Sequence, residues 1–538
     1  MGQTVELYDT TLRDGAQTEG ISYSVQDKLR IAAKLDELGL HYIEGGWPGS
    51  NVKDSQFFRL ARGQRLQSAQ LVAFGSTRRA GLTSARDPNL KALLRADTRT
   101  VTIFGKSWDL HVQGVLKISL DENLKIIEDS VRFLTRHGRR VIYDAEHFFD
   151  GFFTNRAYAL KTIQAAQAAG AETVVFCDTN GGRLPTEITE AVTSASAQLR
   201  VPMGIHTHND SDLGVANAIA AVSAGCRQVQ GTINGYGERC GNADLVSLIA
   251  ILTLKMGRDC LPPGKLKELT EVSRFVAELS NVIPRPNQPF VGATAFAHKG
   301  GVHVNAVMKD PATYEHIDPA RLGNQRKILV SELSGRSSLV LKAQDLALNL
   351  SKNTPTAKRL LARLQQLEHQ GYHFEAAEGS FELLLQRTLN RLKPFFTLGG
   401  FRVVVEKKDG KMVSEATIKL TVDGRQEHTA AEGDGPVNAL DNAIRKALVP
   451  FYPSLAHMRL TDFKVRVLDE KAGTGAKVRV LIQSQDEHDA WGTIGVSENI
   501  IEASWHALVD SIEYKLLKDQ NSTKQSAVST KKKVKRLA

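Results

Sequence analysis

The sequence has 538 residues, of which 42% are hydrophobic and 24% charged, and its formal net charge is +10. This composition is typical of a globular protein with enough apolar residues for several cores, and the length suggests about two to four domains. No run of about 18 apolar residues occurs, and Met1–Glu6 lack the basic and apolar regions of a secretory signal. We therefore expect neither a membrane span nor export.

The cysteines bear on the cellular compartment of the protein, and the basic C-terminus bears on a possible nucleic-acid partner. None of the four cysteines forms a C-x-x-C pair, which fits a reducing, cytoplasmic compartment and argues against zinc-finger and redox motifs. The end Lys531–Arg536 (KKKVKR) is typical of a solvated terminus, so residues 520–538 are predicted to be a disordered tail. A nucleic-acid-binding protein is the alternative from another class and predicts salt-dependent binding. No basic motif interleaved with aromatics supports it, so we expect no nucleic-acid partner.

The N-terminal part of the chain repeats one unit. A short apolar run ends in a polar residue and is followed by an amphipathic helical stretch, such as 27–38, 123–136 or 156–169. Alternating strands and helices predict a parallel sheet, and eight units within roughly 250 residues predict a closed (β/α)8 TIM barrel. We assign residues 1–285 to this barrel. The predicted strands are Val5–Tyr8, His41–Ile43, Leu71–Phe74, Val101–Phe104, Val141–Tyr143, Thr173–Phe176, Met203–Ile205 and Gln228–Ile233.

Polar side chains that follow these strands form the strongest candidate site, because active sites of such barrels lie at the carboxyl ends of the strands. His206 and His208 end the seventh run, and residues i and i+2 of a strand face the same side, so both imidazoles can reach one ion. Asp14 follows the first run and Asn242 the eighth. These four residues predict a divalent metal site, whose oxygen and nitrogen donors suit Mg, Mn or Zn.

Three further residues are candidates for catalysis. Arg13, beside Asp14, can stabilise the alkoxide that develops when a carbonyl is attacked. Glu146 follows the fifth run and needs a positive partner inside the barrel mouth, so we expect an ion pair with Arg13. His303 lies in a glycine-rich segment and is a candidate proton carrier. Lys106 also follows a strand, but the start of a loop explains it well enough.

The pattern changes after residue 285. Three prolines at 284–289 mark a linker, and helical periodicity follows at Ala357–Leu367, so residues 286–395 are predicted to be helical linker and covering subdomains. Residues 396–519 hold an internal repeat of strands followed by one helix. The strands Phe401–Glu406 and Phe463–Leu468 correspond, as do the helices Val437–Leu448 and Ile500–Leu517. A duplicated α+β module favours a regulatory or dimerising domain over a second active site.

Three motifs resemble the signatures of a known family. Asp9–Gly15 (DTTLRDG), His206–Asp210 (HTHND) and Gly235–Asn242 (GYGERCGN) resemble those of the metal-dependent Claisen-condensing barrels. These are the 2-isopropylmalate, homocitrate and citramalate synthases, with related lyases and aldolases. The C-terminal repeat resembles the family's allosteric dimerisation domain, which implies a homodimer. The resemblance implies that the metal ligands are Asp14, His206, His208 and Asn242. It implies that Arg13 is catalytic, with Glu146 as its acidic partner, and that Thr179 contacts the substrate. It also implies that the segment of His303 covers the barrel mouth and that Tyr314 lies near an acyl-CoA site.

Two departures from the isopropylmalate pattern point to one branch of the family. Glu44–Pro48 has the sequence EGGWP where E-A-G-F-P is expected, and Val304–Ala306 stands where Q-D-G is expected. Both variants resemble the citramalate synthase branch, which implies acetyl-CoA and pyruvate as substrates, a route to isoleucine, and isoleucine as an effector. Trp47 in place of phenylalanine would also shrink the oxo-acid pocket. The alternatives are a 2-isopropylmalate synthase acting on 2-oxoisovalerate and, more remotely, an acyl-CoA lyase or aldolase of the same barrel.

Overall fold

A computed structural model describes residues 4–63, 66–329, 354–468 and 475–537. The chain forms two compact units. The first comprises Met1–Phe296 and Glu315–Arg326, and the second comprises Ala297–Tyr314 and Lys327–Ala538. The first unit thus extends past residue 285, and a short segment leaves it and returns to it. Each unit is described by itself below.

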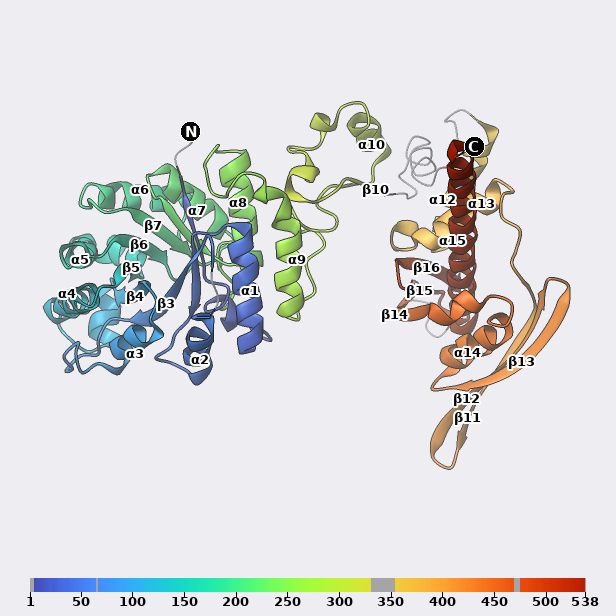
Figure 1. The fold of residues 1–538 in the computed structure, drawn as a ribbon, viewed down its shortest axis with the longest axis horizontal. Coiled ribbons are helices and arrows are strands. Elements are labelled where there is room, and N and C mark those ends of the chain that lie inside the picture. The colour runs from blue at the N-terminus through green and yellow to red at the C-terminus, as the bar shows by residue number, and fades with distance from the viewer. Residues whose placement is uncertain (1–3, 64–65, 330–353, 469–474, 538) are drawn as a thin grey trace. The chain divides into compact units, whose positions relative to one another are not determined.

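The first unit, drawn in blue to green in Figure 1, is a closed barrel of eight parallel strands. The strands follow the order β1 to β8, and β8 pairs with β1 to complete the ring. This confirms the predicted TIM barrel, since each predicted run overlaps one observed strand. The strands are β1 (Glu6–Asp9), β2 (Tyr42–Gly46), β3 (Gln70–Ser76), β4 (Thr100–Lys106), β5 (Arg140–Glu146), β6 (Thr173–Asp178), β7 (Met203–Thr207) and β8 (Gln228–Gly231).

Helices surround the strands, and their ends follow from local sequence. Helix α1, for example, begins after Ser24, whose side chain accepts a hydrogen bond from the backbone of Asp27 while Asp27 accepts one from Ser24. It ends at Gly39, which takes the left-handed conformation with φ of 95°. The barrel helices are α1 (Val25–Leu38), α2 (Val52–Ala61), α3 (Pro88–Ala96), α4 (Leu120–Arg136), α5 (Phe148–Ala168), α6 (Pro185–Ser196), α7 (Gly214–Ser223), α8 (Leu245–Leu254) and α9 (Leu269–Leu279).

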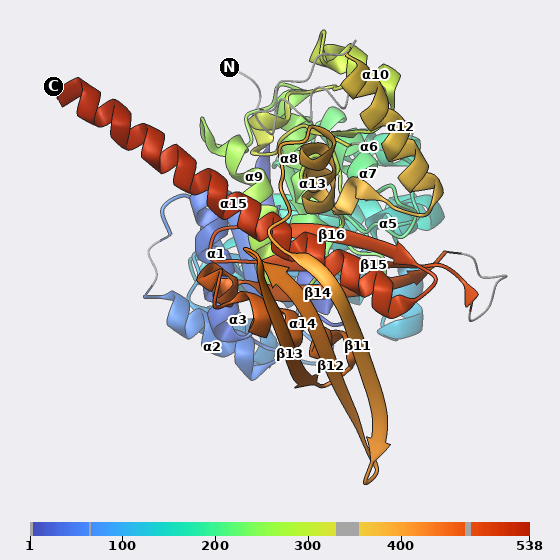
Figure 2. The same cartoon turned by 90° about the vertical axis from the view of Figure 1, so that its right-hand side faces the viewer.

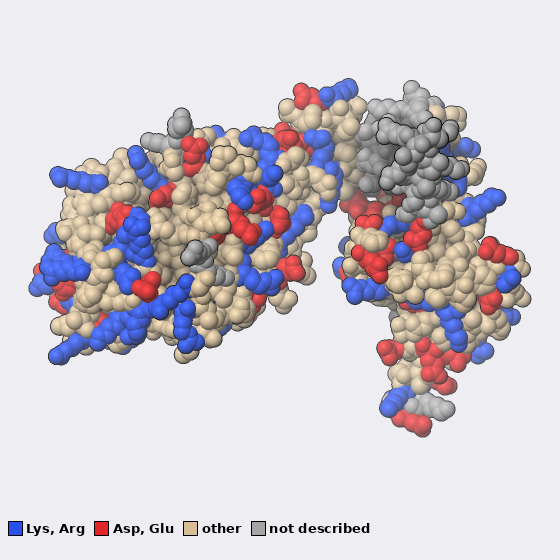
Figure 3. Space-filling view, in the orientation of Figure 1, with Lys and Arg blue, Asp and Glu red and all other residues tan. Residues whose placement is uncertain are grey.

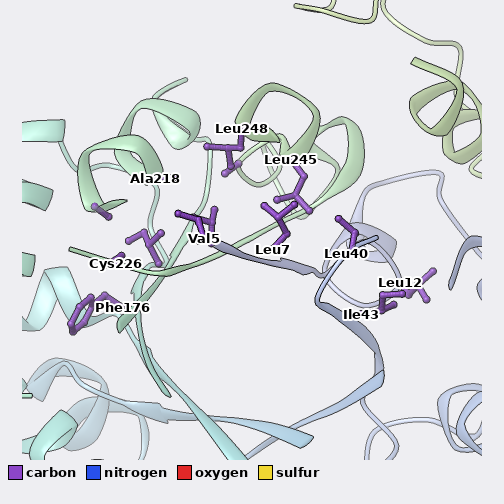
Figure 4. Close-up of a cluster of buried hydrophobic side chains, with 14 of the residues drawn as sticks. Val5, Leu7, Leu12, Leu40, Ile43, Phe176, Ala218, Cys226, Leu245 and Leu248 are labelled. Atoms are coloured by element: carbon purple, nitrogen blue, oxygen red, sulfur yellow. The ribbon is translucent and has the colours of Figure 1, made fainter. Parts of the chain in front are cut away.

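Strand alternation divides the barrel side chains into two sets. Outward-facing residues pack against the helices: Leu7 of β1, and Val5 just before it, lie beside Leu245 and Leu248 of α8 (Figure 4). Tyr8, the residue after Leu7, points the other way and belongs to a separate buried cluster with residues of β2, β3, β5 and β6. The same alternation on β5 and β8 turns polar side chains into the interior, which the site uses.

From residue 354 on, the described part of the second unit contains two helices followed by the predicted repeat. Each repeat is a three-stranded antiparallel sheet followed by one helix, which packs on its own sheet. Both helices contribute to one hydrophobic core, and Figure 2 shows α15 lying along β15 and β16. The elements are α12 (Pro355–His369), α13 (Glu378–Thr388), β11 (Thr397–Lys408), β12 (Lys411–Val422), β13 (Arg425–Gly433), α14 (Pro436–Leu448), β14 (Arg459–Val467), β15 (Val478–Gln485), β16 (Ala490–Ser497) and α15 (Ile500–Leu537).

The basic C-terminus differs from the expectation of a disordered tail. Helix α15 runs on to Leu537 and includes these residues. No glycine or proline occurs after residue 497 to end the helix, and lysine, glutamine and alanine are good helix formers. The side chains of residues 522–537 lie outside the described part.

The surface carries both signs of charge. On the face seen in Figure 3, Lys and Arg side chains lie among Asp and Glu side chains on both units. Within the described residues, no helix combines the length and apolar character needed to cross a membrane.

One packing contact at the barrel mouth predicts a loss of stability. A Cβ at Gly151, in the first turns of α5, would lie 2.1 Å from the carbonyl oxygen of Ser107 in the loop after β4. Gly151→Ala is therefore expected to lower the free energy of unfolding by about 1–3 kcal/mol in chemical denaturation. Gly182→Ala is the control, because a Cβ there meets nothing within 4 Å. Equal losses in both variants would contradict the packing argument.

Candidate active site

Three of the four predicted metal ligands converge at the carboxyl ends of β1 and β7. Asp14, His206 and His208 are buried, and one ligand atom from each lies within 4.8 Å of the other two. His206 Nε2 is 3.5 Å from Asp14 Oδ2 and 3.3 Å from His208 Nε2. In the described part of the chain this is the single cluster of three or more histidine, cysteine or acidic side chains with such spacing.

Asn242 completes the predicted set from the loop after β8. Its backbone pairs with that of His208, and its buried side-chain Oδ1 has no hydrogen-bond partner. The loop folds tightly enough to bring it there because of its glycines: a Cβ at Gly241, whose φ is +89°, would lie 2.0 Å from the Gly235 carbonyl oxygen. A buried acceptor without a partner beside a carboxylate and two imidazoles fits a divalent cation.

The electrostatics of the cluster favour the forms that bind a metal. Burial raises the pKa of Asp14, but Arg13 and the two histidines outweigh it and lower the pKa to about 2. Burial, with a smaller effect of His206, lowers the pKa of His208 to about 3. At neutral pH the carboxylate is therefore ionised and the His208 imidazole is neutral, as ligation requires.

Arg13 lies beside the cluster and is held on three sides. Its Nε donates to Glu44 Oε1 at 2.6 Å, and its NH1 donates to Asp14 Oδ2 at 3.1 Å. The guanidinium carbon lies 3.8 Å from the centre of the Phe74 ring. Burial lowers the pKa of Arg13, but Glu44 and Asp14 outweigh it and raise the pKa, so the side chain stays cationic. Tyr8 donates to the other oxygen of Glu44 at 2.6 Å and fixes that carboxylate in turn.

The predicted ion pair between Arg13 and Glu146 is wrong. Glu146 pairs with Lys106, which lies directly opposite it in the register of β4 and β5. Glu44 takes its place beside Arg13 because β2 is the neighbour of β1. The sequence placed both Glu44 and Lys106 at strand ends, but it gave Glu44 no role in the site and Lys106 was explained as the start of a loop.

Thr179 follows β6 and contacts the end of β5. The backbone N–H of His147 donates to Thr179 Oγ1 at 2.9 Å, so this hydroxyl accepts one bond and keeps its own hydrogen as a donor. His147 adopts the left-handed conformation with φ of 57°, and its Nδ1 lies 2.9 Å from Asp150 Oδ2. Sequence reasoning did not identify His147, because one histidine after a strand carries no pattern.

His303 and Tyr314 belong to the second unit. His303 lies on the short helix α10 (Gly301–Val307), and its ring stacks on that of Tyr314 with 4.1 Å between centroids. Both side chains are exposed within the unit. Their predicted roles toward the barrel site stay predictions.

An aromatic wall lies next to Arg13. Trp47 packs edge-on against Phe74 and Phe104, with centroid distances of 5.8 and 5.6 Å. Its Nε1 donates to Asn89 Oδ1 at 2.7 Å, which fixes the orientation of the indole. Trp47, which departs from the isopropylmalate pattern, thus packs against Phe74, the ring that contacts Arg13.

Fold and site together define a metal-binding (β/α)8-barrel enzyme, and comparison with known proteins narrows this class. The HMGL-like family matches residues 4–276. The homocitrate synthase post-HMGL domain-like family matches residues 290–371, and the LeuA allosteric (dimerisation) domain matches residues 375–516.

Relatives matched over nearly their whole length identify the branch of the family. An (R)-citramalate synthase of Geobacter sulfurreducens is 54% identical over 518 residues, covering 96% of this chain and 98% of the relative. That of Aquifex aeolicus is 54% identical over 524 residues, covering 97% and 99%. A 2-isopropylmalate synthase of Methanocaldococcus jannaschii is only 29% identical, over 96% of this chain and 95% of the relative. The chain belongs to the (R)-citramalate synthases, acyltransferases with an HMGL-like barrel, as its motifs predicted.

Proposed function

We propose that this protein condenses acetyl-CoA with pyruvate and water to give (R)-citramalate and CoA. The observation that carries the proposal is the buried cluster of Asp14, His206 and His208 with Arg13 held against it. The resemblance to (R)-citramalate synthases over nearly the whole chain supports the choice of substrates. The product would serve a route to isoleucine.

Asp14, His206, His208 and Asn242 would hold the divalent cation, and Mg, Mn and Zn all accept such donors. The bound cation would act as a Lewis acid that polarises the 2-oxo acid. Arg13 cannot rotate away, because Glu44, Asp14 and Phe74 hold it, so it presents a fixed positive charge to the keto oxygen as that oxygen becomes an alkoxide. The hydroxyl hydrogen of Thr179 is available for a substrate oxygen.

Proton removal from the acetyl methyl starts the reaction, and Glu146 and His303 are the proposed participants. Lys106 pairs with Glu146 and holds its carboxyl group in place. The methyl carbon then forms a bond to the keto carbon of pyruvate, while the keto oxygen takes up a proton. Water cleaves the thioester, so CoA leaves as the thiol and the carboxylate of citramalate forms. Hydrolysis makes the whole sequence effectively irreversible.

Trp47 is proposed to restrict the oxo acid to the methyl group of pyruvate. The indole is held by Asn89 and fills space beside Phe74 and Phe104. Trp47→Phe is expected to raise kcat/KM for 2-oxoisovalerate relative to pyruvate by about tenfold or more, the usual effect of changing a pocket by a methylene or two. Trp491→Phe, in the second unit, is the control and should leave this ratio unchanged. An unchanged ratio in Trp47→Phe would refute the steric role.

The second unit is proposed to bind isoleucine as an inhibitor and to form a homodimer. The LeuA allosteric (dimerisation) domain match at 375–516 supports this proposal. Light scattering of the full chain should give twice the mass of the 58.9 kDa protomer. Isoleucine should lower the rate, while leucine at the same concentration should have a smaller effect; equal inhibition by both amino acids would reject isoleucine as the specific effector.

The activity itself is tested by the release of CoA thiol. The purified protein is incubated with acetyl-CoA, a divalent metal and either pyruvate or 2-oxoisovalerate. Faster release with pyruvate supports the proposal, and chiral analysis of the product should identify (R)-citramalate. Preference for 2-oxoisovalerate would make the protein a 2-isopropylmalate synthase, and no release with either oxo acid would reject condensation.

A further inference from the structure

A chain of buried polar side chains runs across the barrel interior to one of the metal-site histidines. His206 Nδ1 lies 3.0 Å from Gln230 Oε1, and Gln230 Nε2 donates to Asp144 Oδ1 at 3.1 Å. Asp144 lies on β5, Gln230 on β8 and His206 on β7. Their exposed fractions are 3%, 0% and 5%, so each polar atom needs a partner inside the protein.

The direction of these bonds determines which nitrogen of His206 carries the proton. In the structure the NH₂ end of the Gln230 amide faces Asp144, and Oδ1 of Asp144 accepts from it. The carbonyl end of that amide then faces His206 Nδ1, which must be the N–H. Nε2 is left with its lone pair, and it is the nitrogen that faces Asp14 Oδ2 and His208 Nε2. The opposite tautomer would place a proton where the metal must bind.

We propose that Gln230 and Asp144 are positioning residues that hold His206 in the tautomer able to bind the metal. The inference deepens the proposed metal site and rests on it. Asp144 acts only through Gln230: it keeps the amide from turning over. Burial and the nearby Glu44 carboxylate raise the pKa of Asp144 well above its ordinary value, yet a carboxyl protonated on Oδ2 still offers Oδ1 as the acceptor.

A matched control lies on the same strand. Gln228 precedes Gln230 by two residues on β8, so both side chains point into the barrel. Gln228 is equally buried at 1% exposure, but its Nε2 lies 3.5 Å from Glu6 and no bond connects it to a metal-site histidine. Gln228→Leu therefore creates the same change of chemistry without touching His206.

Titration of the metal-free full-length protein with Co²⁺ tests the proposal, by calorimetry and by the visible absorption of the bound ion. Gln230→Leu should bind Co²⁺ about 10–100-fold more weakly and with an altered spectrum, as loss of a partner of a ligating histidine does. Gln230→Glu keeps an acceptor for Nδ1–H and should bind within a few-fold of the original protein. Gln228→Leu should bind like the original protein.

A second pair of variants covers the case in which Gln230→Leu does not fold, which circular dichroism reveals. Asp144→Leu frees the amide and should weaken Co²⁺ binding, while Asp144→Asn keeps an acceptor and should restore it. Unchanged binding in both leucine variants, or a loss in Gln228→Leu as large as in Gln230→Leu, overturns the proposal. Failure of the original protein to bind Co²⁺ overturns the metal site itself, whereas normal Co²⁺ binding without CoA release rejects only the reaction.

Discussion

Asp14→Ala is expected to reduce CoA release by about a thousandfold or more and to abolish measurable metal binding. The carboxylate is the one charged group of the cluster, and both imidazoles are neutral ligands. Its loss removes the interaction that draws the cation between His206 and His208. A metal ion that polarises a carbonyl contributes several kcal/mol to the transition state, and each 1.36 kcal/mol corresponds to about a factor of ten in rate. Thiol release and Co²⁺ calorimetry measure the two effects.

Two variants make this experiment specific. Asp97→Asn is the control for the chemical change, because Asp97 lies at the end of α3 in the left-handed conformation, which asparagine tolerates. It should keep full activity. Asp14→Asn keeps the shape of the side chain but lacks its charge, and it should bind the metal weakly and remain nearly inactive. Full activity in either Asp14 variant would show that Asp14 is not a metal ligand.

Arg13→Lys is expected to lower kcat by about 100–1,000-fold while metal affinity changes little. Lysine keeps the positive charge, but it cannot bond Glu44 and Asp14 together from one planar group. The charge is then no longer fixed toward the keto oxygen, and removal of one such donor has costs of this size in other enzymes. Steady-state kinetics with pyruvate, combined with Co²⁺ titration, separates the loss of rate from loss of the metal.

Arg140→Lys serves as the control, because Arg140 holds Glu172 at the amino end of β5, away from the site. Glu44→Gln tests the arrangement itself. A glutamine oxygen still accepts from Arg13 but without charge, so we expect a smaller loss of kcat, about tenfold. The assignment of Glu44 as the partner of Arg13 would be wrong on two results taken together. Glu44→Gln would retain full activity, and Arg13→Lys would cause no further loss of kcat in a protein that already carries Glu146→Gln.

The sequence by itself determined the barrel and most of its metal site. Alternating strands and helices repeat eight times, and a parallel barrel must bring all its strand ends to one mouth. The positions of Asp14, His206 and His208 after their strands were therefore sufficient to place them together. The C-terminal repeat was equally visible, because each unit carries its own strand pattern and closing helix. The motifs also determined the family, since three of them occur in order within the barrel and the C-terminal repeat resembles the family's dimerisation domain.

Only the tertiary structure decided which charged groups pair across the barrel. Strand ends converge in any register, but the partner of a given side chain depends on which strand is adjacent and how the two are offset. Because of that geometry, Arg13 forms an ion pair with Glu44, and Glu146 forms one with Lys106. Buried polar residues in mid-strand, such as Gln230, were invisible to sequence reasoning for the same reason. Their role lies in contacts between strands far apart in the chain, which no local pattern encodes.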